Sequence, residues 1–208
     1  MQKQRLISKN HLMMKSDNVA KEEKALHLLN EYRSGNDKAF ETLYHLYDAQ
    51  LLDYGTCLAE DRELVRDCIQ DVFLQLVIRS RRQLINKVGG YLFVSLRNRI
   101  LDAFRKKAVA EALTAGGYGS MEYVESTESQ FISTEDAIQA HKNVISLFSE
   151  LTPRQQEAFH LYFLEQRKYD EICKILKMDN PCVRNLIYRG MTRLRTSDTY
   201  QRIRAITE

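Results

Sequence analysis

The hydrophobic positions of this chain recur mostly at intervals of three and four residues, which is the spacing of one buried face of an α-helix. Residues 1–23 are polar and show no clear periodicity, so they are expected to form a flexible tail. A helix is then predicted from Lys24 to Arg33, with Gly35 as its C-terminal cap. A second helix follows Asp37, a residue that can cap a helix N-terminus.

A third predicted helix starts at Asp61 and is long and amphipathic. A loop is expected at about Gln83–Gly90, and a fourth helix from Tyr91 to about Lys107. Four such helices can bury one shared core, so residues 24–107 are predicted to form a small helical bundle. The third helix ends in a cluster of basic residues: Arg79, Arg81 and Arg82.

The second half of the chain has the same helical period after a change in composition. Residues 108–139 are acidic, contain three glycines and show little periodicity, which predicts a flexible linker. Residues 140–200 are predicted to form a second helical domain. Its helices are expected to begin at the capping box Thr152-Pro153-Arg154-Gln155, at Tyr169, and at Asn180-Pro181.

Composition supports an all-α fold of two small domains. The 208 residues include only 8 glycines and 2 prolines, far fewer turn residues than a β-sandwich or barrel needs. No uncharged apolar run reaches the roughly 18 residues of a membrane-spanning helix, and no signal-peptide core is present, so a cytoplasmic location is expected. The four cysteines are dispersed, which indicates reduced, buried thiols rather than disulfides or a zinc site.

Charge is distributed unevenly. The net charge is +3, but residues 108–139 hold six acidic residues and no basic residue, whereas the segments on either side are both net basic. Basic segments suit phosphate backbones, and DNA would repel the acidic segment. Neighbouring acids such as Glu22 and Glu23 are typical of a solvated face.

The sequence contains no recognisable catalytic arrangement. It has no Walker loop, no dinucleotide-binding glycine motif and no nucleophile elbow, and its histidines lack the spacing of a helical metal pair. We therefore expect no catalytic residues, no metal and no cofactor.

Two short helices joined by four residues at 169–195 predict a helix-turn-helix. Its second helix has one apolar face and one face rich in arginine and amide side chains, which suits DNA. An ordinary basic surface helix is the alternative interpretation.

These motifs resemble bacterial RNA polymerase sigma factors. Leu151-Thr152-Pro153-Arg154-Gln155-Gln156, Tyr169-Asp170-Glu171-Ile172 and Leu194-Arg195 resemble region 4, and Asp67-Cys68-Ile69-Gln70-Asp71-Val72-Phe73 resembles region 2. Having only these two regions, joined by a linker, is the arrangement of the extracytoplasmic-function (ECF) subfamily. The chain departs from the family at Glu165-Gln166-Arg167 and at Lys177-Met178-Asp179, where glycine is common; we expect Asp179 and Asn180 to adopt any left-handed conformation needed.

The resemblance implies a non-enzymatic subunit that binds core RNA polymerase and directs promoter recognition, regulated by an anti-sigma factor that is often membrane-bound. Polymerase contacts would be Asp67, Gln70, Asp71 and Phe73. The −10 promoter element would be held by Asn86, Lys87, Tyr91, Asn98, Arg99, Arg105 and Lys106. The −35 element would be bound by Arg154, Arg184, Asn185, Tyr188, Arg189 and Arg193.

For several of these residues a purely structural role is the alternative: Asp67 and Asp71 could form a solvated acidic edge, and Tyr91 could belong to the core. The acidic linker could thread the polymerase cleft or act only as a tether. At the level of the whole chain, the alternative is a stand-alone helix-turn-helix regulator whose N-terminal domain senses a ligand or dimerises. That regulator would bind a palindrome without needing polymerase.

Overall fold

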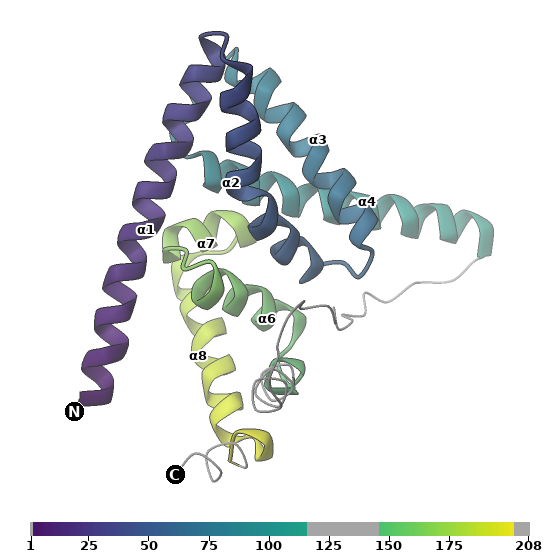
Figure 1. The fold of residues 1–208 in the computed structure, drawn as a ribbon. Coiled ribbons are helices and arrows are strands. Elements are labelled where there is room, and N and C mark those ends of the chain that lie inside the picture. Colours follow the sequence, from purple (N-terminus) through teal and green to yellow (C-terminus); the bar gives the residue numbers. More distant parts are fainter. Residues whose placement is uncertain (1, 116–145, 202–208) are drawn as a thin grey trace, which may run out of the picture. The chain divides into compact units, whose positions relative to one another are not determined.

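The computed structural model describes the backbone of residues 2–115 and 146–201, and the side chains of residues 18–109 and 146–201. All regular structure within these ranges is helical, which confirms the predicted all-α class (Figure 1). In chain order the elements are α1 (Gln2–Arg33), α2 (Asp37–Thr56), α3 (Arg62–Ser80), α4 (Val88–Ala115), α6 (Pro153–Phe159), the π-helical turn η1 (His160–Leu164), α7 (Tyr169–Leu176) and α8 (Asn180–Thr196).

The chain divides into two compact units. The first comprises residues 1–55 and 61–119 and contains α1 to α4; the second comprises residues 56–60 and 120–208 and contains α6, η1, α7 and α8. Most of the linker predicted for residues 108–139 lies outside the described residues.

The first unit is held together by a dense apolar and aromatic core. Phe73 on α3 packs against two rings of α2, with its centroid 4.8 Å from that of Tyr44 and 6.0 Å from that of Phe40. Helices α2 and α3 approach so closely at Gly55 that a Cβ atom there would lie 2.3 Å from Val65 Cγ1. The fully buried leucine and isoleucine side chains are Leu29, Leu43, Leu51, Ile69, Leu76, Leu92, Leu96 and Ile100.

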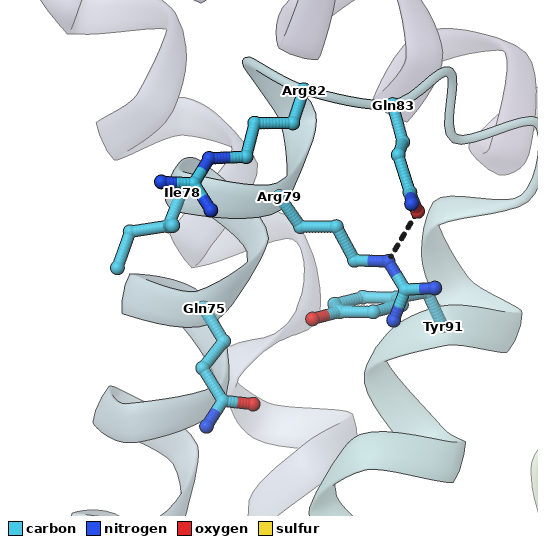
Figure 2. A pocket seen from close by; sticks show the side chains of 6 residues that line it. All are labelled: Gln75, Ile78, Arg79, Arg82, Gln83 and Tyr91. Atoms are coloured by element: carbon cyan, nitrogen blue, oxygen red, sulfur yellow. Dashed lines mark hydrogen bonds between the residues drawn. The ribbon is translucent and has the colours of Figure 1, made fainter.

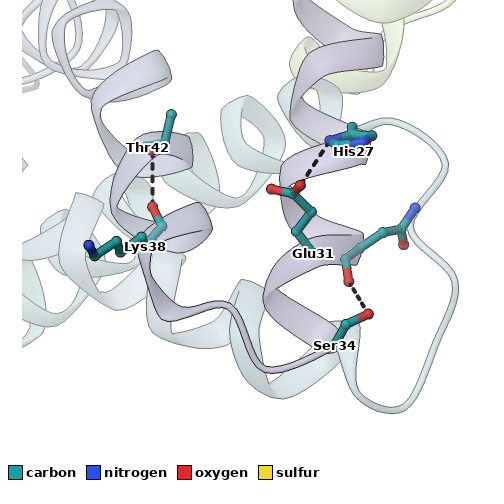
Figure 3. A network of polar contacts seen from close by, with 6 residues as sticks. His27, Glu31, Ser34, Lys38 and Thr42 are labelled. Atoms are coloured by element: carbon teal, nitrogen blue, oxygen red, sulfur yellow. Dashed lines mark hydrogen bonds and ion pairs between the residues drawn. The ribbon is translucent and has the colours of Figure 1, made fainter.

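The turn between α1 and α2 is fixed by local polar contacts (Figure 3). Gly35 has φ of 101°, a left-handed conformation that only glycine adopts at low cost. The Ser34 hydroxyl donates to the Asn30 carbonyl, and Thr42 donates to the Lys38 carbonyl one turn into α2.

The predicted cap of the third helix is also present, because the Asp61 carboxylate accepts the backbone N–H groups of Glu63 and Leu64.

Two helices of the first unit are longer than predicted. Helix α1 begins at Gln2, so most of the segment for which we expected a tail is helical. Helix α4 begins at Val88 and continues to Ala115, whereas the pair Gly89-Gly90 had suggested a loop as far as residue 90. Glycine lowers helix propensity by about 1 kcal/mol, and tertiary contacts can outweigh that preference.

The second unit begins with the capping box predicted at Thr152, which is present in full. The helix predicted to run through Leu164 instead changes to π-helical geometry at His160. Helices α6 and α8 pack closely at Gly190, where a Cβ atom would lie 2.5 Å from a ring carbon of Phe159.

Helices α7 and α8 form the predicted helix-turn-helix, but the turn differs in detail. The left-handed residue is Lys177, with φ of 55°, and not Asp179 or Asn180. Asp179 is the N-cap of α8 and accepts the Cys182 N–H at 3.2 Å. Gln166, before α7, is left-handed as well, with φ of 51°.

Among the described residues, no helix combines the length and the apolar character needed to cross a membrane.

Candidate nucleic-acid and protein interfaces

One face of helix α3 is exposed to solvent and carries both polar and apolar side chains. Asp67 and Gln70 are exposed, as predicted. The same face continues with Leu74 and Ile78, one and two helical turns beyond Gln70, and these side chains are 61% and 57% exposed. Sequence reasoning assigned neither residue to a surface, although both lie off the apolar stripe predicted for this helix, which includes Val72, Phe73, Leu76 and Val77. An exposed leucine and isoleucine side by side, flanked by a carboxylate and an amide, are typical of a protein-binding surface.

Phe73 does not belong to that face. Its side chain is only 2% exposed and packs against the aromatic rings of α2. The prediction that Phe73 meets the polymerase is therefore wrong for this structure: residue 73 points inward, opposite to the exposed positions of α3.

Asp71 and Arg99, predicted to contact different partners, are bound to each other. The Arg99 guanidinium donates to one oxygen of Asp71 from two nitrogens, at 2.6 and 3.0 Å. This ion pair joins α3 to α4, and both side chains remain about half exposed. A charge-assisted bond of this geometry fixes the direction of the guanidinium, so Arg99 and Asp71 act as a pair.

A pocket of about 340 Å³ lies between the end of α3 and the start of α4 (Figure 2). The Arg79 guanidinium lies over the Tyr91 ring, 5.4 Å from its centroid, and its Nε donates to Gln83 Oε1 at 3.1 Å. Tyr91 is thus partly exposed at a pocket wall and not fully in the core. The complete lining is Gln75, Ile78, Arg79, Arg82, Gln83 and Tyr91.

The remaining predicted −10 residues lie in the loop before α4 and along α4. Asn86 and Lys87 are exposed in the loop before α4, and Asn98 is partly exposed on α4. Arg105 and Lys106 are exposed further along α4, and Arg105 pairs with Asp102 at 2.8 Å. The basic cluster at the end of α3 is the signal that could have added Arg79 and Arg82 to this set.

In the second unit, all six predicted −35 residues are exposed. Five lie on α8 and one, Arg154, lies in the first turn of α6, where it pairs with Glu157 at 3.2 Å. Tyr188 is 70% exposed, so its ring is accessible to a binding partner.

Arg184 on α8 is held in a defined position. Its Nε donates to Asn180 Oδ1 at 2.7 Å, and its guanidinium lies over the ring of Tyr169 from α7, 5.3 Å from the centroid. Asn180 in turn donates to Asp170 at 3.4 Å. These contacts connect the first turn of α8 to the first turn of α7.

Asp179, at the N-terminus of α8, is a carboxylate with a lowered pKa. Hydrogen bonds from the Cys182 side chain and backbone lower the pKa of Asp179 below its usual range, and the same contact raises the pKa of the Cys182 thiol. Asp179 therefore stays ionised beside the positive end of the helix.

Comparison with known proteins agrees with both units. Residues 141–194 match the family model described as Sigma-70, region 4. The ECF RNA polymerase sigma factor SigM of Bacillus subtilis (strain 168) is 22% identical over 155 residues, which are 74% of this chain and 92% of that protein.

Two solved structures share the fold. The sigma factor RpoE from Bartonella quintana, solved in complex with the anti-sigma factor NepR, superposes with a TM-score of 0.60 at 19% identity, covering 76% of this chain and 95% of that one. CnrH, solved with the cytosolic domain of CnrY, superposes with a TM-score of 0.56 at 17% identity, covering 82% and 94%.

Proposed function

We propose that this chain, a sigma factor of the extracytoplasmic-function subfamily, binds core RNA polymerase and directs it to promoters at transcription initiation. The observation that carries the proposal is the pairing of two units in one chain: a helix-turn-helix whose α8 exposes arginine and amide side chains, and a four-helix unit with a basic pocket beside an exposed protein-binding face.

Recognition of the −35 element is assigned to α8. A recognition helix places its N-terminal turns nearest the base edges of the major groove. Arg184 and Asn185 lie in those turns, and their side chains are the types that read guanine and adenine. Arg189 and Arg193 lie one and two turns further on and suit phosphate contacts. Arg154 adds a further phosphate contact from α6.

The −10 element is assigned to the loop at residues 81–87 and the pocket beside it. Single-stranded DNA is bound by combining aromatic faces for bases with cations for phosphates. Tyr91 and Arg79 supply both groups at one point, and Arg82, Asn86 and Lys87 extend the polar surface. Arg99 takes part in the orientation that Asp71 gives it.

Polymerase binding is assigned to the exposed face of α3. Asp67 and Gln70 supply polar contacts, while Leu74 and Ile78 supply the apolar area that the centre of a protein interface needs. Asp71 borders this face through its ion pair with Arg99. Phe73 takes no part.

The similar structures of RpoE and CnrH each contain a bound partner, and we assign this chain an anti-sigma partner of its own. Its role needs no catalysis by the chain itself, and it is exercised in the cytoplasm on nucleoid DNA.

Run-off transcription tests the proposal. Purified chain is mixed with core RNA polymerase on candidate promoter fragments, and core enzyme alone is the control. Transcripts that start at discrete sites only when the chain is present are the expected result. A chain that binds palindromic DNA as a dimer but neither binds core enzyme nor produces new transcripts would show a stand-alone regulator instead.

A further inference from the structure

Glu22 on α1 reaches across the first unit to the start of α4. Its two carboxylate oxygens lie 3.1 and 3.2 Å from the backbone nitrogen of Gly89, which donates to them, and one oxygen also accepts the Tyr47 hydroxyl at 3.4 Å. Glu22, Tyr47 and Gly89 lie on three different helices, and Glu22 and Gly89 are 67 positions apart in the sequence. The expectation that Glu22 and Glu23 form a solvated pair therefore holds only for Glu23, which is exposed.

The position of this carboxylate is that of a helix cap supplied from elsewhere in the fold. The first N–H groups of an α-helix have no partner within the helix, and Gly89 is the second residue of α4. A negative charge at a helix N-terminus is also favoured by the helix dipole. Glu22 thus gives α4 a reason to begin at Val88, despite two successive glycines.

The support for Glu22 is itself well ordered. Tyr47, which donates to it, is 1% exposed in the core. Lys21 lies over the Tyr47 ring, 4.6 Å from its centroid, and hydrogen-bonds to Gln50 on α2. The carboxylate is therefore held between α1 and α2 and presented to α4.

We infer that Glu22 is a positioning residue for the −10 promoter strand, acting through the start of α4. The loop at residues 81–87 ends where α4 begins, and Tyr91 lies one turn into the helix. Fixing the Gly89 backbone therefore fixes both Asn86-Lys87 on one side and the Tyr91 pocket on the other. This inference rests on the proposed function, and it assigns to α1 a part in promoter binding through the helix that it caps.

The test compares Glu22→Ala and Glu22→Gln with the matched controls Glu23→Ala and Glu23→Gln. The neighbouring residue has the same side chain and is exposed, so its variants make the same change in net charge without removing the cap. In Glu22→Gln the side chain can still accept the Gly89 N–H but carries no charge, so this variant should keep part of the capping contribution that Glu22→Ala loses.

Three measurements are made on each full-length variant: hydrogen exchange of the Gly89 amide, affinity for core polymerase, and affinity of the assembled holoenzyme for a single-stranded oligonucleotide carrying the −10 sequence. We expect Glu22→Ala to expose the Gly89 amide and to weaken oligonucleotide binding by about threefold to tenfold, as when a capped, binding-competent conformation becomes less populated. Discrimination among base-substituted oligonucleotides should fall as well. Core binding and binding of a −35 duplex should stay within about twofold of the parent chain.

A merely structural role gives a different pattern. If Glu22→Ala lowered core, −35 and −10 binding by the same factor, the residue would support the fold and not the −10 site, and the inference would be wrong. Oligonucleotide affinity equal to that of Glu23→Ala, or an unchanged Gly89 exchange rate in Glu22→Ala, would also overturn it. If Glu22→Ala does not fold, Glu22→Gln decides between the same outcomes.

The proposed function fails separately. A parent chain that drives no transcription and binds no −10 oligonucleotide would remove the sigma-factor assignment. In that case Gly89 exchange would still show whether Glu22 caps α4.

Discussion

Lys177 offers a direct test of how this helix-turn-helix accommodates its turn. The residue follows α7 with φ of 55° and ψ of 48°, a left-handed conformation that glycine usually occupies at the end of a helix. Its amide donates to the Cys173 carbonyl, so the turn has the regular capping bond but not the regular residue. We predict that Lys177→Gly stabilises the second unit.

The expected gain follows from two opposing effects. The left-handed conformation costs an L-residue with a Cβ atom about 1–2 kcal/mol. Glycine removes that strain but makes the unfolded chain more flexible, which costs about 0.4–1 kcal/mol. The net stabilisation should therefore be about 0.5–1 kcal/mol. For a unit of this size, that corresponds to a rise in melting temperature of about 2–8 °C.

Lys177→Ala is the matched control, because it removes the same charged side chain and keeps the Cβ atom. Thermal unfolding followed by circular dichroism gives the stability, and hydrogen exchange in α7 and α8 shows that the gain lies in this unit. A Lys177→Gly variant no more stable than Lys177→Ala would refute the strain argument. Gln166→Gly, at the other left-handed position, should behave in the same way.

Four further predictions concern packing, partners and pH. Gly190→Ala should destabilise the second unit by about 1–3 kcal/mol, since its new methyl group would lie 2.5 Å from a Phe159 ring carbon; an unchanged melting temperature would contradict the packing at this point. Leu74→Arg should weaken core polymerase binding about tenfold in a pull-down titration, because it places a charge in the apolar part of the proposed interface. The control Leu84→Arg, at a residue even more exposed than Leu74, should not, and equal retention of both variants would remove Leu74 from that interface. Arg184→Ala should weaken binding to a matched −35 duplex by about 1–3 kcal/mol and relax base preference. Arg193→Ala should instead lower the affinity for all duplexes alike and reduce the salt dependence of binding by about one charge. An equal loss of affinity for every duplex in Arg184→Ala would mean that Arg184 only anchors phosphate. The pKa of Asp179 is lower in the folded chain than in the unfolded chain, so its carboxylate stabilises the start of α8 at pH values above the unfolded pKa, and this contribution is lost as pH falls through the lower folded pKa. Asp179→Asn can still cap the helix but does not titrate, so it should make the melting temperature depend less steeply on pH in that acidic range. An unaltered slope would show that another group titrates there.

Local signals predicted much of the fold. The start of α3 follows from Asp61, and the capping box at Thr152 follows from a four-residue motif. The limits Tyr169–Leu176 of α7 follow from apolar spacing between clear breaks. In each case the residues that define the element lie within a few positions of its ends.

The features that were missed depend on residues distant in sequence. Helix α4 starts at Val88 and not at Tyr91, because Glu22 supplies a cap from 67 residues away. The family resemblance assigned Phe73 to the polymerase contact although its spacing puts it on the apolar stripe of this helix, and its ring is buried against α2. No spacing rule indicated that Lys177 would be the left-handed residue of the turn or that a π-helical turn would begin at His160.

The same distinction applies to the candidate site. Exposure of α8 residues could be predicted from a single helical face, and all six residues predicted to bind the −35 element are exposed. The pairing of Asp71 with Arg99 could not, because it requires knowing which turns of α3 and α4 face each other. Charge and motif indicate the type of ligand, whereas tertiary packing decides which side chains remain available to it.

The contacts of Arg184 have a consequence for the thermodynamics of DNA binding. A free arginine side chain loses up to about 2 kcal/mol of rotamer entropy when it is fixed against a base or phosphate. Here Asn180 and the Tyr169 ring already restrict the guanidinium in the unbound chain, so much of that entropy is lost during folding. If α8 binds the −35 element as proposed, binding through this arginine would be less opposed by entropy than binding through Arg189 or Arg193, and part of the affinity would depend on two residues that need not touch DNA.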